Sequence, residues 1–271
     1  MTRGGRDRVD HYGATYGRFA ASVYAEVRSE AFGEDIGQTG WLSAPEHDRF
    51  LSWLRLDRGD RLLDVACGSG GPTLRAVRLT GCTATGIDLH ADAIRTAREQ
   101  AGAAGLAGGA EFLQADASGT LPFPDAAFDA VICVDAINHL PDRAQTLREW
   151  ARVLRPAGRV LFTDPVVVTG AVTGEELRTR SAIGTFLFVP AGYDEQVLEE
   201  AGFALEERED RTGNMARIAR RWHDARAARA DVLREVEGDE TFEGQQQFFE
   251  VAARLATERR LSRVAFAARR P

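Results

Sequence analysis

A strand, a glycine-rich turn and a helix follow one another in residues 61–73, and this stretch constrains the fold most strongly. The apolar run Leu62 to Ala66 predicts a buried strand, which three glycines within four residues end before a helical pattern begins. Gly68 and Gly70 lack a Cβ, so their backbone can adopt positive φ and approach a ligand closely. The following helix N-terminus offers free amides and a partial positive charge to an anion.

The spacing of the glycines distinguishes two kinds of nucleotide site. A dinucleotide fingerprint needs a third glycine three residues after the second, and Thr73 occupies that position. The run instead resembles the first motif of class I methyltransferases that depend on S-adenosylmethionine, in which an acidic residue precedes Gly-x-Gly. Asp64, Gly68 and Gly70 match that motif. A dinucleotide site and a purely structural turn are the alternatives.

Two further runs carry the same resemblance. Residues 121–131, LPFPDAAFDAV, closely resemble the entry to the fourth strand in methyltransferases that act on small molecules, the type 11-like group. Residues 153–164, VLRPAGRVLFTD, are another match. The resemblance covers about residues 60–165 well and implies a doubly wound, seven-stranded, mostly parallel α/β sheet with an antiparallel last strand and a helical cap. Alternating strand and helix patterns from residue 60 onward also favour such a sheet.

The length of 271 residues suits one large α/β domain with additions. We expect an N-terminal helical lid over residues 1–58 and a Rossmann-like methyltransferase domain over residues 59–271. A helical cap insertion is expected at about residues 211–258. In that insertion, five arginines predict a solvated face with interleaved acidic residues; they are Arg217, Arg220, Arg221, Arg226 and Arg229.

Two apolar stretches outside the matched region have two interpretations each. A helix predicted over His11 to Glu30 carries a stripe on one face, formed by Tyr12, Tyr16, Phe19 and Val23. This stripe either packs on the domain or closes the active site beside the sulfonium. Residues 186–190, FLFVP, either belong to the core or form a wall of the substrate pocket.

Acidic residues close two of the predicted strands. Asp88 follows the strand predicted over Thr83 to Ile87, where a carboxylate can accept both ribose hydroxyls of a nucleoside or cap the next helix. The resemblance assigns Asp116, after the third strand, to the adenine amino group, although this residue also begins a turn. The complete set that the resemblance implies for S-adenosylmethionine is Gln38, Asp64, Ala66, Gly68, Gly70, Asp88, Leu89, Asp116, Ala117 and Val134.

The fourth predicted strand delivers His139 to the edge of the sheet where ligands bind. Members of the family often carry a histidine before Leu-x-Asp here, and His139 matches it, whereas Asn138 replaces a second histidine. With an ordinary pKa near neutrality, His139 is the candidate general base. Asp164, predicted to end the neighbouring fifth strand, could orient or assist it. The alternative is that His139 caps a helix or packs in the core.

Composition limits the partners and the location. A net charge of −7 favours no nucleic-acid surface, and no apolar run approaches the ~18 residues of a spanning helix. Met1 to Asp10 is polar and lacks the apolar centre of a signal peptide, so we expect a cytoplasmic protein without a membrane partner. Cys67, Cys82 and Cys133 are predicted to be reduced core residues, and the five histidines lack a zinc spacing.

The predicted function is transfer of a methyl group from S-adenosylmethionine to a small-molecule acceptor, in secondary or specialised metabolism. The nucleophile can be oxygen, nitrogen or carbon. The alternatives are an NAD(P)-dependent oxidoreductase and a non-catalytic protein that binds S-adenosylmethionine. A homo-oligomer is also possible.

Overall fold

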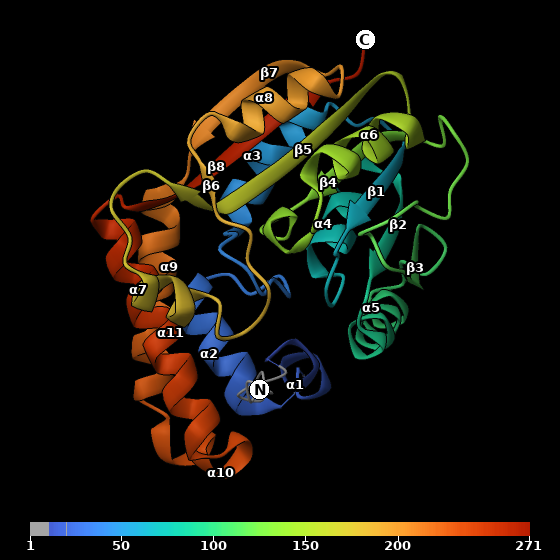
Figure 1. Ribbon diagram of the computed structural model, residues 1–271. Coiled ribbons are helices and arrows are strands. Elements are labelled where there is room, and N and C mark those ends of the chain that lie inside the picture. The colour runs from blue at the N-terminus through green and yellow to red at the C-terminus, as the bar shows by residue number, and fades with distance from the viewer. Residues whose placement is uncertain (1–10, 20) are drawn as a thin grey trace, which may run out of the picture.

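The computed structural model describes residues 11–19 and 21–271 (Figure 1). Within this part of the chain, eight strands form one sheet in the order β3-β2-β1-β4-β5-β8-β7, and β6 pairs with β5 beside this path. The strands are β1 (Arg61–Val65), β2 (Thr83–Asp88), β3 (Ala110–Gln114), β4 (Phe128–Cys133), β5 (Leu154–Val168), β6 (Val189–Pro190), β7 (Ala204–Asp210) and β8 (Leu261–Arg269).

Strand directions confirm the predicted fold class. Strands β1 to β5 pair in parallel, and β8 runs antiparallel to both of its neighbours, β5 and β7. The two-residue strand β6, parallel to β5, is an addition to the predicted seven strands. Because β1, β2, β3 and β4 are parallel, their carboxyl ends lie at one edge of the sheet, where ligands bind in such folds.

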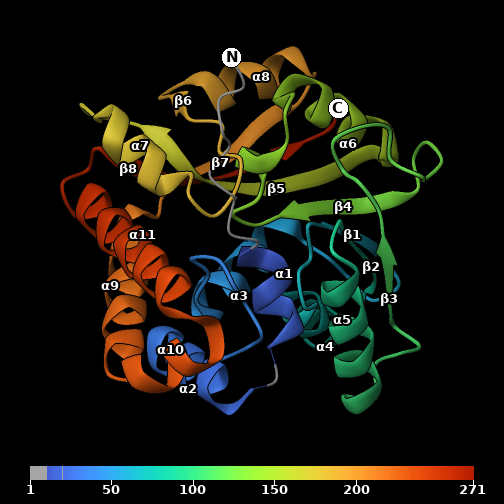
Figure 2. The same cartoon turned by 60° about the horizontal axis from the view of Figure 1, so that its bottom comes forward.

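Helices cover both faces of the sheet (Figures 1 and 2). Apolar side chains of α6 and α8, including Trp150 and Val197, complete the core on one face. Those of α3, α4 and α5 complete it on the other. The helices are α1 (His11–Gly17), α2 (Ser22–Phe32), α3 (Ala44–Leu54), α4 (Gly71–Thr80), α5 (Ala91–Ala103), η1 (Ile137–His139), α6 (Arg143–Val153), α7 (Gly174–Arg180), α8 (Tyr193–Glu200), α9 (Thr212–Ala227), α10 (Ala230–Glu237) and α11 (Asp239–Thr257). In the described part of the chain, none has the length and apolarity needed to cross a bilayer.

Helix α2 packs beside α9 although nearly two hundred residues separate them, and α10 and α11 complete this helical group (Figures 1 and 2). Val27 of α2, Ala225 of α9 and Phe242 of α11 share one buried cluster. The prediction of a solvated arginine face is wrong for Arg226, which is buried and paired with Glu237. Its partner lies on α10, which the helical spacing of α9 cannot reveal.

The helix predicted over residues 11–30 is in fact two helices. Helix α1 ends at Gly17 and α2 begins at Ser22, so Phe19 lies in the turn between them. Arg28 fixes this turn, because its Nη1 donates to the Phe19 carbonyl at 2.9 Å and its guanidinium lies 3.8 Å from the centre of the Phe19 ring. The aromatic stripe therefore divides, with Tyr12 and Tyr16 on α1.

The prediction that Asp164 ends the fifth strand is wrong. Strand β5 continues to Val168, because β8 pairs antiparallel along it and places Asp164 opposite Val264. The Asp164 side chain is fully buried and accepts a hydrogen bond from Arg143 Nη1 at 2.5 Å. Arg143 also donates to Asp194 at 2.6 Å, so the three residues form a closed ion-pair group in the core.

A second buried ion-pair group joins the sheet to the N-terminal segment. Arg263 of β8 donates from Nε to Asp135 at 2.6 Å and from Nη1 to Glu46 of α3 at 2.8 Å. All three side chains are almost completely shielded from solvent. Glu46 also accepts from Arg211 Nε at 2.5 Å. Segments from both ends of the chain thus meet at one guanidinium.

This group gives a prediction for stability. Arg263→Met should lower the free energy of unfolding by about 3 to 5 kcal/mol, because it leaves Asp135 and Glu46 buried with less compensating charge. Urea denaturation followed by circular dichroism measures this change. The control is Arg269→Met on the same strand, because the ion pair of Arg269 with Glu206, at 3.3 Å, is partly exposed to solvent. We expect this variant to lose less than about 1 kcal/mol of unfolding free energy. Equal losses in the two variants would contradict the assignment.

Candidate active site

The turn between β1 and α4 has a backbone that few side chains permit. Ala66, Gly68 and Gly70 all have positive φ, at 58°, 55° and 80°. Gly71 has no space for a side chain, since a Cβ there would lie 1.8 Å from the carbonyl oxygen of Ile36. The turn is therefore packed backbone to backbone against the segment that precedes Gln38.

Hydrogen bonds hold the turn in place on both sides. Ser69 Oγ donates to the Gly37 carbonyl at 2.8 Å, and Gln100 Nε2 donates to the Ser69 carbonyl at 2.9 Å. The amide of Gly68 donates to Asp88 Oδ2 at 3.0 Å. The glycine-rich turn is thus fixed by an N-terminal loop, by α5 and by the end of β2.

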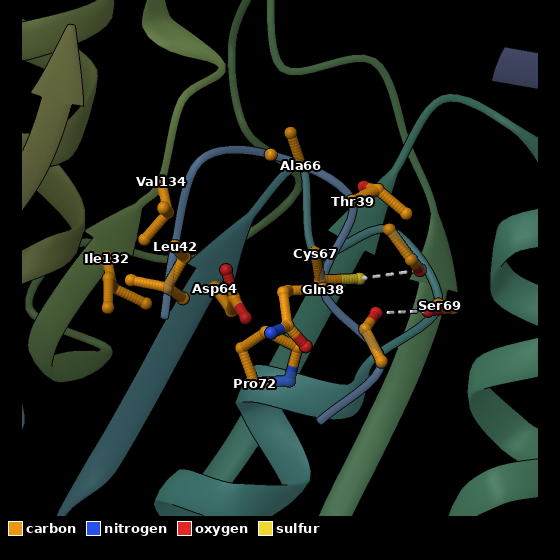
Figure 3. A pocket seen from close by; sticks show the side chains of 13 residues that line it. Gln38, Thr39, Leu42, Asp64, Ala66, Cys67, Ser69, Pro72, Ile132 and Val134 are labelled. Atoms are coloured by element: carbon orange, nitrogen blue, oxygen red, sulfur yellow. Dashed lines mark hydrogen bonds between the residues drawn. The ribbon is translucent and has the colours of Figure 1, made fainter. Parts of the chain in front are cut away.

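A cavity with about 460 Å³ of open space lies against this turn (Figure 3). Five of the residues predicted to bind the cofactor line it: Gln38, Asp64, Ala66, Gly68 and Val134. Figure 3 shows the Asp64 carboxylate beside Pro72 and Gln38, with apolar side chains across from it. The structure thus brings together half of the predicted set around one cavity, which we call the glycine-loop cavity.

Asp64 is a buried carboxyl with one side-chain donor. Thr73 Oγ1 donates to its Oδ2 at 2.5 Å. Burial raises the pKa of Asp64 to about 7, the Thr73 hydrogen bond opposes this shift, and the nearby Asp88 charge adds to it. Thr73, which replaces the third glycine of a dinucleotide fingerprint, therefore supports the acidic residue of the motif.

Asp88 supports the glycine-rich turn but does not cap α5, because His90 occupies the N-cap position. Its Oδ1 accepts from the amide of His90 at 2.9 Å and lies 3.1 Å from His90 Nδ1, and its Oδ2 accepts from Gly68. The side chain is buried, with 6% of its surface exposed. Each carboxylate oxygen has two acceptor positions, so Oδ2 has room for a further donor.

Three other residues of the predicted cofactor set, Leu89, Asp116 and Ala117, lie outside the glycine-loop cavity, on the neighbouring surface. Leu89 is 59% exposed, and Asp116 is exposed with its Oδ1 accepting from the Ser118 amide at 2.8 Å. The pairing of β2 with β3 places Gln114 opposite Asp88, so Asp116 and Ala117 follow Asp88 along the same edge. Gly70 is not a wall of the cavity either, because it faces inward against Ala97 and Phe112.

Gln38 lines the cavity, but its amide is used within its own turn. Its Oε1 accepts from the Ile36 amide at 2.7 Å, and its Nε2 donates to the Glu34 carbonyl at 3.0 Å. The residue is almost fully buried. Gln38 thus shapes the loop that packs on Gly71, a role that the loose sequence match did not predict.

A second cavity, with about 680 Å³ of open space, adjoins the first, and Thr39 and Gly40 line both. Its walls come from α1, η1, α7, α9 and α11 and from the segment after α7. Aromatic rings dominate these walls, with Trp41, Phe186, Phe248, Phe249 and Trp222 among them. Residues 186–190 divide between core and cavity: Val189 is buried in the core, and Phe186 lines this cavity, which we call the aromatic cavity.

His139 lines the aromatic cavity at the end of η1. Its Nδ1 lies 2.7 Å from the Thr185 carbonyl, which can only accept, so Nδ1 carries the proton of the neutral ring. Nε2, 3.1 Å from the Tyr12 hydroxyl, is then the acceptor. Burial lowers the pKa of His139 below its ordinary value, the Thr185 hydrogen bond opposes the shift, and the Arg180 charge adds to it. The imidazole is therefore neutral at pH 7.

The structure does not bring Asp164 to the same cavity as His139. The carboxylate points into the core, toward Arg143 and Asp194, and it does not line the aromatic cavity. Tyr12 takes the position beside His139 instead. Burial raises the pKa of the Tyr12 phenol well above its ordinary value, so its hydroxyl remains a donor.

Sequence analysis missed Arg180, a buried residue of the aromatic cavity. Arg180 ends α7, a helix whose capping box at Thr173 the sequence shows clearly. Helix α7 carries four charged residues, and both Arg178 and Arg180 are among them. The sequence pattern therefore does not show that Arg180 is buried while Arg178 is exposed. Its burial depends on packing by α11 and by Trp41, which lie far away in the sequence.

The chain is similar to known methyltransferases. A family model described as a methyltransferase domain matches residues 63–162. The chain is similar to the 27-O-demethylrifamycin SV methyltransferase of Amycolatopsis mediterranei, with 32% identity over 201 residues that cover 69% of this chain and 73% of that protein.

Solved structures show the same fold. The chain is similar to the cyclopropane synthase MmaA2 of Mycobacterium tuberculosis, with a TM-score of 0.82, 17% identity and coverage of 96% of this chain and 98% of that one. It is also similar to a phosphoethanolamine N-methyltransferase 2 of Haemonchus contortus, solved with phosphomonomethylethanolamine and S-adenosylhomocysteine. There the TM-score is 0.79 and the identity 19%, over 96% of this chain and 60% of that one. At such identities the likeness establishes the fold alone.

The raised pKa of Asp64 gives a prediction. A carboxyl whose folded-state pKa of about 7 exceeds its ordinary value of 3.8 stabilises the fold below pH 3.8, and this contribution is lost as the pH rises to about 7. Asp64→Asn has no such group. The stability of the wild type relative to this variant should therefore fall between pH 5 and 7, by up to about 1.4 kcal/mol per pH unit, and level off above pH 8.

Urea denaturation at several pH values measures the difference. Asp231→Asn, which removes a carboxylate from an exposed position on α10, serves as the baseline. Parallel stability curves for the wild type and Asp64→Asn would refute the buried-carboxyl interpretation.

Proposed function

The chain belongs to the class I S-adenosylmethionine-dependent methyltransferases that act on small molecules, and from this membership we propose that the glycine-loop cavity holds the donor and the aromatic cavity the acceptor. The enzyme transfers a methyl group from S-adenosylmethionine to a small-molecule acceptor. The observation that carries the assignment of the two cavities is their common wall at Thr39 and Gly40. Because the same two residues line both cavities, a donor in one and an acceptor in the other would lie next to each other.

The residues around the glycine-loop cavity fit the donor. A Cβ on Gly68 would lie 2.9 Å from the Tyr16 hydroxyl, so the open backbone at this position depends on glycine. We propose that Asp88 accepts the ribose hydroxyls and that Leu89, Asp116 and Ala117 flank the adenine on the exposed edge. Gly68 and Gly70 would give the turn its shape, while Asp64 and Ala66 would line the methionine end together with Gln38 and Val134.

When bound, the donor supplies an electrophilic methyl group and its own leaving group. The protein must hold the acceptor in line, exclude water and, for a hydroxyl or carbon acid, remove a proton. We propose that His139 Nε2 removes this proton, because the neutral ring presents that atom to the aromatic cavity. The Thr185 carbonyl fixes the tautomer. Tyr12 covers Nε2 until the acceptor takes its place.

The residues around the two cavities also bear on the division of the chain into a lid, a cap and a methyltransferase domain. We propose that residues 1–58 act as a lid and that the helices of about residues 211–258 act as a cap on the methyltransferase domain of residues 59–271. Tyr12 and Tyr16 of α1 and Trp222 and Phe248 of the helical insertion contribute to the site, which favours these roles.

The other parts of the proposal concern the cellular setting. Three buried, unpaired thiols favour a reducing compartment such as the cytoplasm; they are Cys67, Cys82 and Cys133. A net charge of −7 favours a small molecule over a nucleic acid as partner. The reported relatives offer no support for an NAD(P)-dependent oxidoreductase, and the cavity beside the donor site favours an enzyme over a non-catalytic binding protein.

The donor assignment predicts the effect of Asp88. Asp88→Asn keeps the shape of the side chain and an oxygen that can accept from the Gly68 amide, but it removes the negative charge. Binding of S-adenosylmethionine should therefore weaken by the roughly 1.5 to 3 kcal/mol of charged hydrogen bonds. NAD and NADP should bind negligibly. Calorimetric titration of the full chain measures both.

Glu99→Gln on α5 is the matched control, because it removes one negative charge from an exposed side chain. Its affinity for the donor should equal that of the wild type. Tighter binding of NAD or NADP than of S-adenosylmethionine would establish the oxidoreductase alternative.

The base assignment predicts a kinetic effect. His139→Ala should leave the affinity for the donor unchanged and lower kcat by the ~10² to 10⁴ typical of acid–base catalysis. Because burial lowers the pKa of His139, the rate of the wild type should decline on the acid side below pH 6.5, and this limb should be absent in the variant. Release of S-adenosylhomocysteine follows the reaction.

His223→Ala on α9 provides the control, since that ring lies on the surface next to Asp224 and outside both cavities. It should keep kcat within about a factor of three. If His139→Ala does the same and retains the pH profile, His139 has a structural role.

A further inference from the structure

We propose that Arg180 binds an anionic oxygen group of the methyl acceptor, so that the acceptor is an organic acid with an apolar body. This inference rests on the proposed function, because it assigns the aromatic cavity to the acceptor. It narrows the acceptor from any small molecule to those that carry a carboxylate or a phosphate.

Arg180 is completely buried, and its guanidinium has no hydrogen-bond partner in residues 11–19 and 21–271. Among the described residues, no acceptor lies within hydrogen-bond distance of its Nε, Nη1 or Nη2. Burial lowers its pKa to about 10, so the side chain is still charged at pH 7. An unpaired buried charge is costly, and native proteins nearly always provide a partner for it.

Other fully buried arginines of the described chain show the usual solution. Each of them forms an ion pair with at least one carboxylate: Arg143 with Asp164 and Asp194, Arg226 with Glu237, and Arg263 with Asp135 and Glu46. Arg180 thus differs from them in lacking an anion. Since it lines a cavity with open space, a ligand can supply that anion.

The surroundings of Arg180 stabilise a cation but offer it no acceptor. Its guanidinium carbon lies 4.6 Å from the ring centre of Phe248, 5.3 Å from that of Phe186 and 5.8 Å from that of Trp41. Cation–π contacts of this kind compensate part of the desolvation cost. The N–H groups still need oxygen acceptors, and a planar guanidinium suits a carboxylate or phosphate with two of them.

The remaining charged groups of the cavity do not satisfy Arg180. Asp135 is the one acidic residue among the described lining residues, and its oxygens already accept from Arg263, Thr163 and the Trp41 amide. His139 is neutral, and Arg226 is paired with Glu237 outside the lining. The cavity therefore presents a positive charge among aromatic walls, which matches an anionic head on an apolar or aromatic body.

The position of Arg180 also suits the reaction. Its guanidinium carbon lies 5.3 Å from the ring centre of Phe186, and the His139 ring centre lies 4.7 Å from the same point, so the anion would bind near the candidate base. Tyr12 borders both residues in the same cavity. An acceptor anchored at Arg180 would have its reactive atom held at a fixed distance from its acidic group.

Calorimetry with matched probes tests the proposal. The full chain, saturated with S-adenosylhomocysteine, is titrated with 3-phenylpropionate, with the neutral 3-phenylpropionamide and with phenyl phosphate. We expect an anion to bind about 10- to 100-fold more tightly than the amide, the range for hydrogen bonds to a charged group. The two anions distinguish a carboxylate from a phosphate as the group recognised.

In Arg180→Met this preference should disappear. The thermal midpoint of the unliganded variant should equal or exceed that of the wild type, because a buried unpaired charge has been replaced by an apolar side chain of similar length. Arg178→Met, on the exposed side of the same helix, should keep the preference. The proposal is overturned if the wild type binds neither 3-phenylpropionate nor phenyl phosphate more tightly than the amide, including the case in which no probe binds at millimolar concentration. It is also overturned if Arg180→Met is destabilised but still prefers an anion to the amide.

Titration with S-adenosylhomocysteine separates this failure from failure of the proposed function. Wild type and Arg180→Met should bind it equally. A loss confined to the variant would place Arg180 on the donor carboxylate and overturn the inference alone. Absence of binding by the wild type would instead refute the donor site.

Discussion

The site depends on one buried guanidinium, that of Arg263. Strand β8 supplies it near the end of the chain, and it pairs with Glu46 from α3 and with Asp135 beyond β4. Asp135 in turn accepts from the Trp41 amide at 2.7 Å, which holds the segment of Gly40 and Trp41 between the two cavities. The segment that lines both cavities is therefore fixed by a charge from the last strand, and a buried pair of this kind admits few alternative arrangements.

Two residues at the same edge of the sheet have a strained backbone. Ala66 after β1 and Asp135 after β4 both have positive φ without being glycine. Such a conformation persists only where neighbours determine it, and here the Cys67 amide donates to the Ile87 carbonyl while the Asp135 amide donates to Thr163. Regular β structure ends just before both residues, and Ala66 lines the glycine-loop cavity while Asp135 lines the aromatic cavity.

Local sequence was sufficient for the sheet and for the glycine-rich turn, because their determinants lie within a few residues of one another. The run from Leu62 to Gly71 specifies a strand and its turn whatever surrounds it. Asp164 could not be placed in this way, because pairing with β8 extends β5 past it and Arg143 neutralises it in the core. Arg180 could not be found either, since what distinguishes it is that no described residue pairs with it in three dimensions.

Helix α1 connects the two halves of the site through tyrosines one turn apart. Their ring centres are 6.4 Å apart, with Tyr16 against the glycine-rich turn at Gly68 and Tyr12 hydrogen-bonded to His139. An acceptor that reaches His139 Nε2 must displace the Tyr12 hydroxyl. Because both rings stand on one helix of seven residues, a shift of the whole helix would carry Tyr16 along with Tyr12. A single short element thus contacts both the glycine-rich turn and the His139 ring, so an aromatic stripe at helical spacing packs against two parts of the site at once.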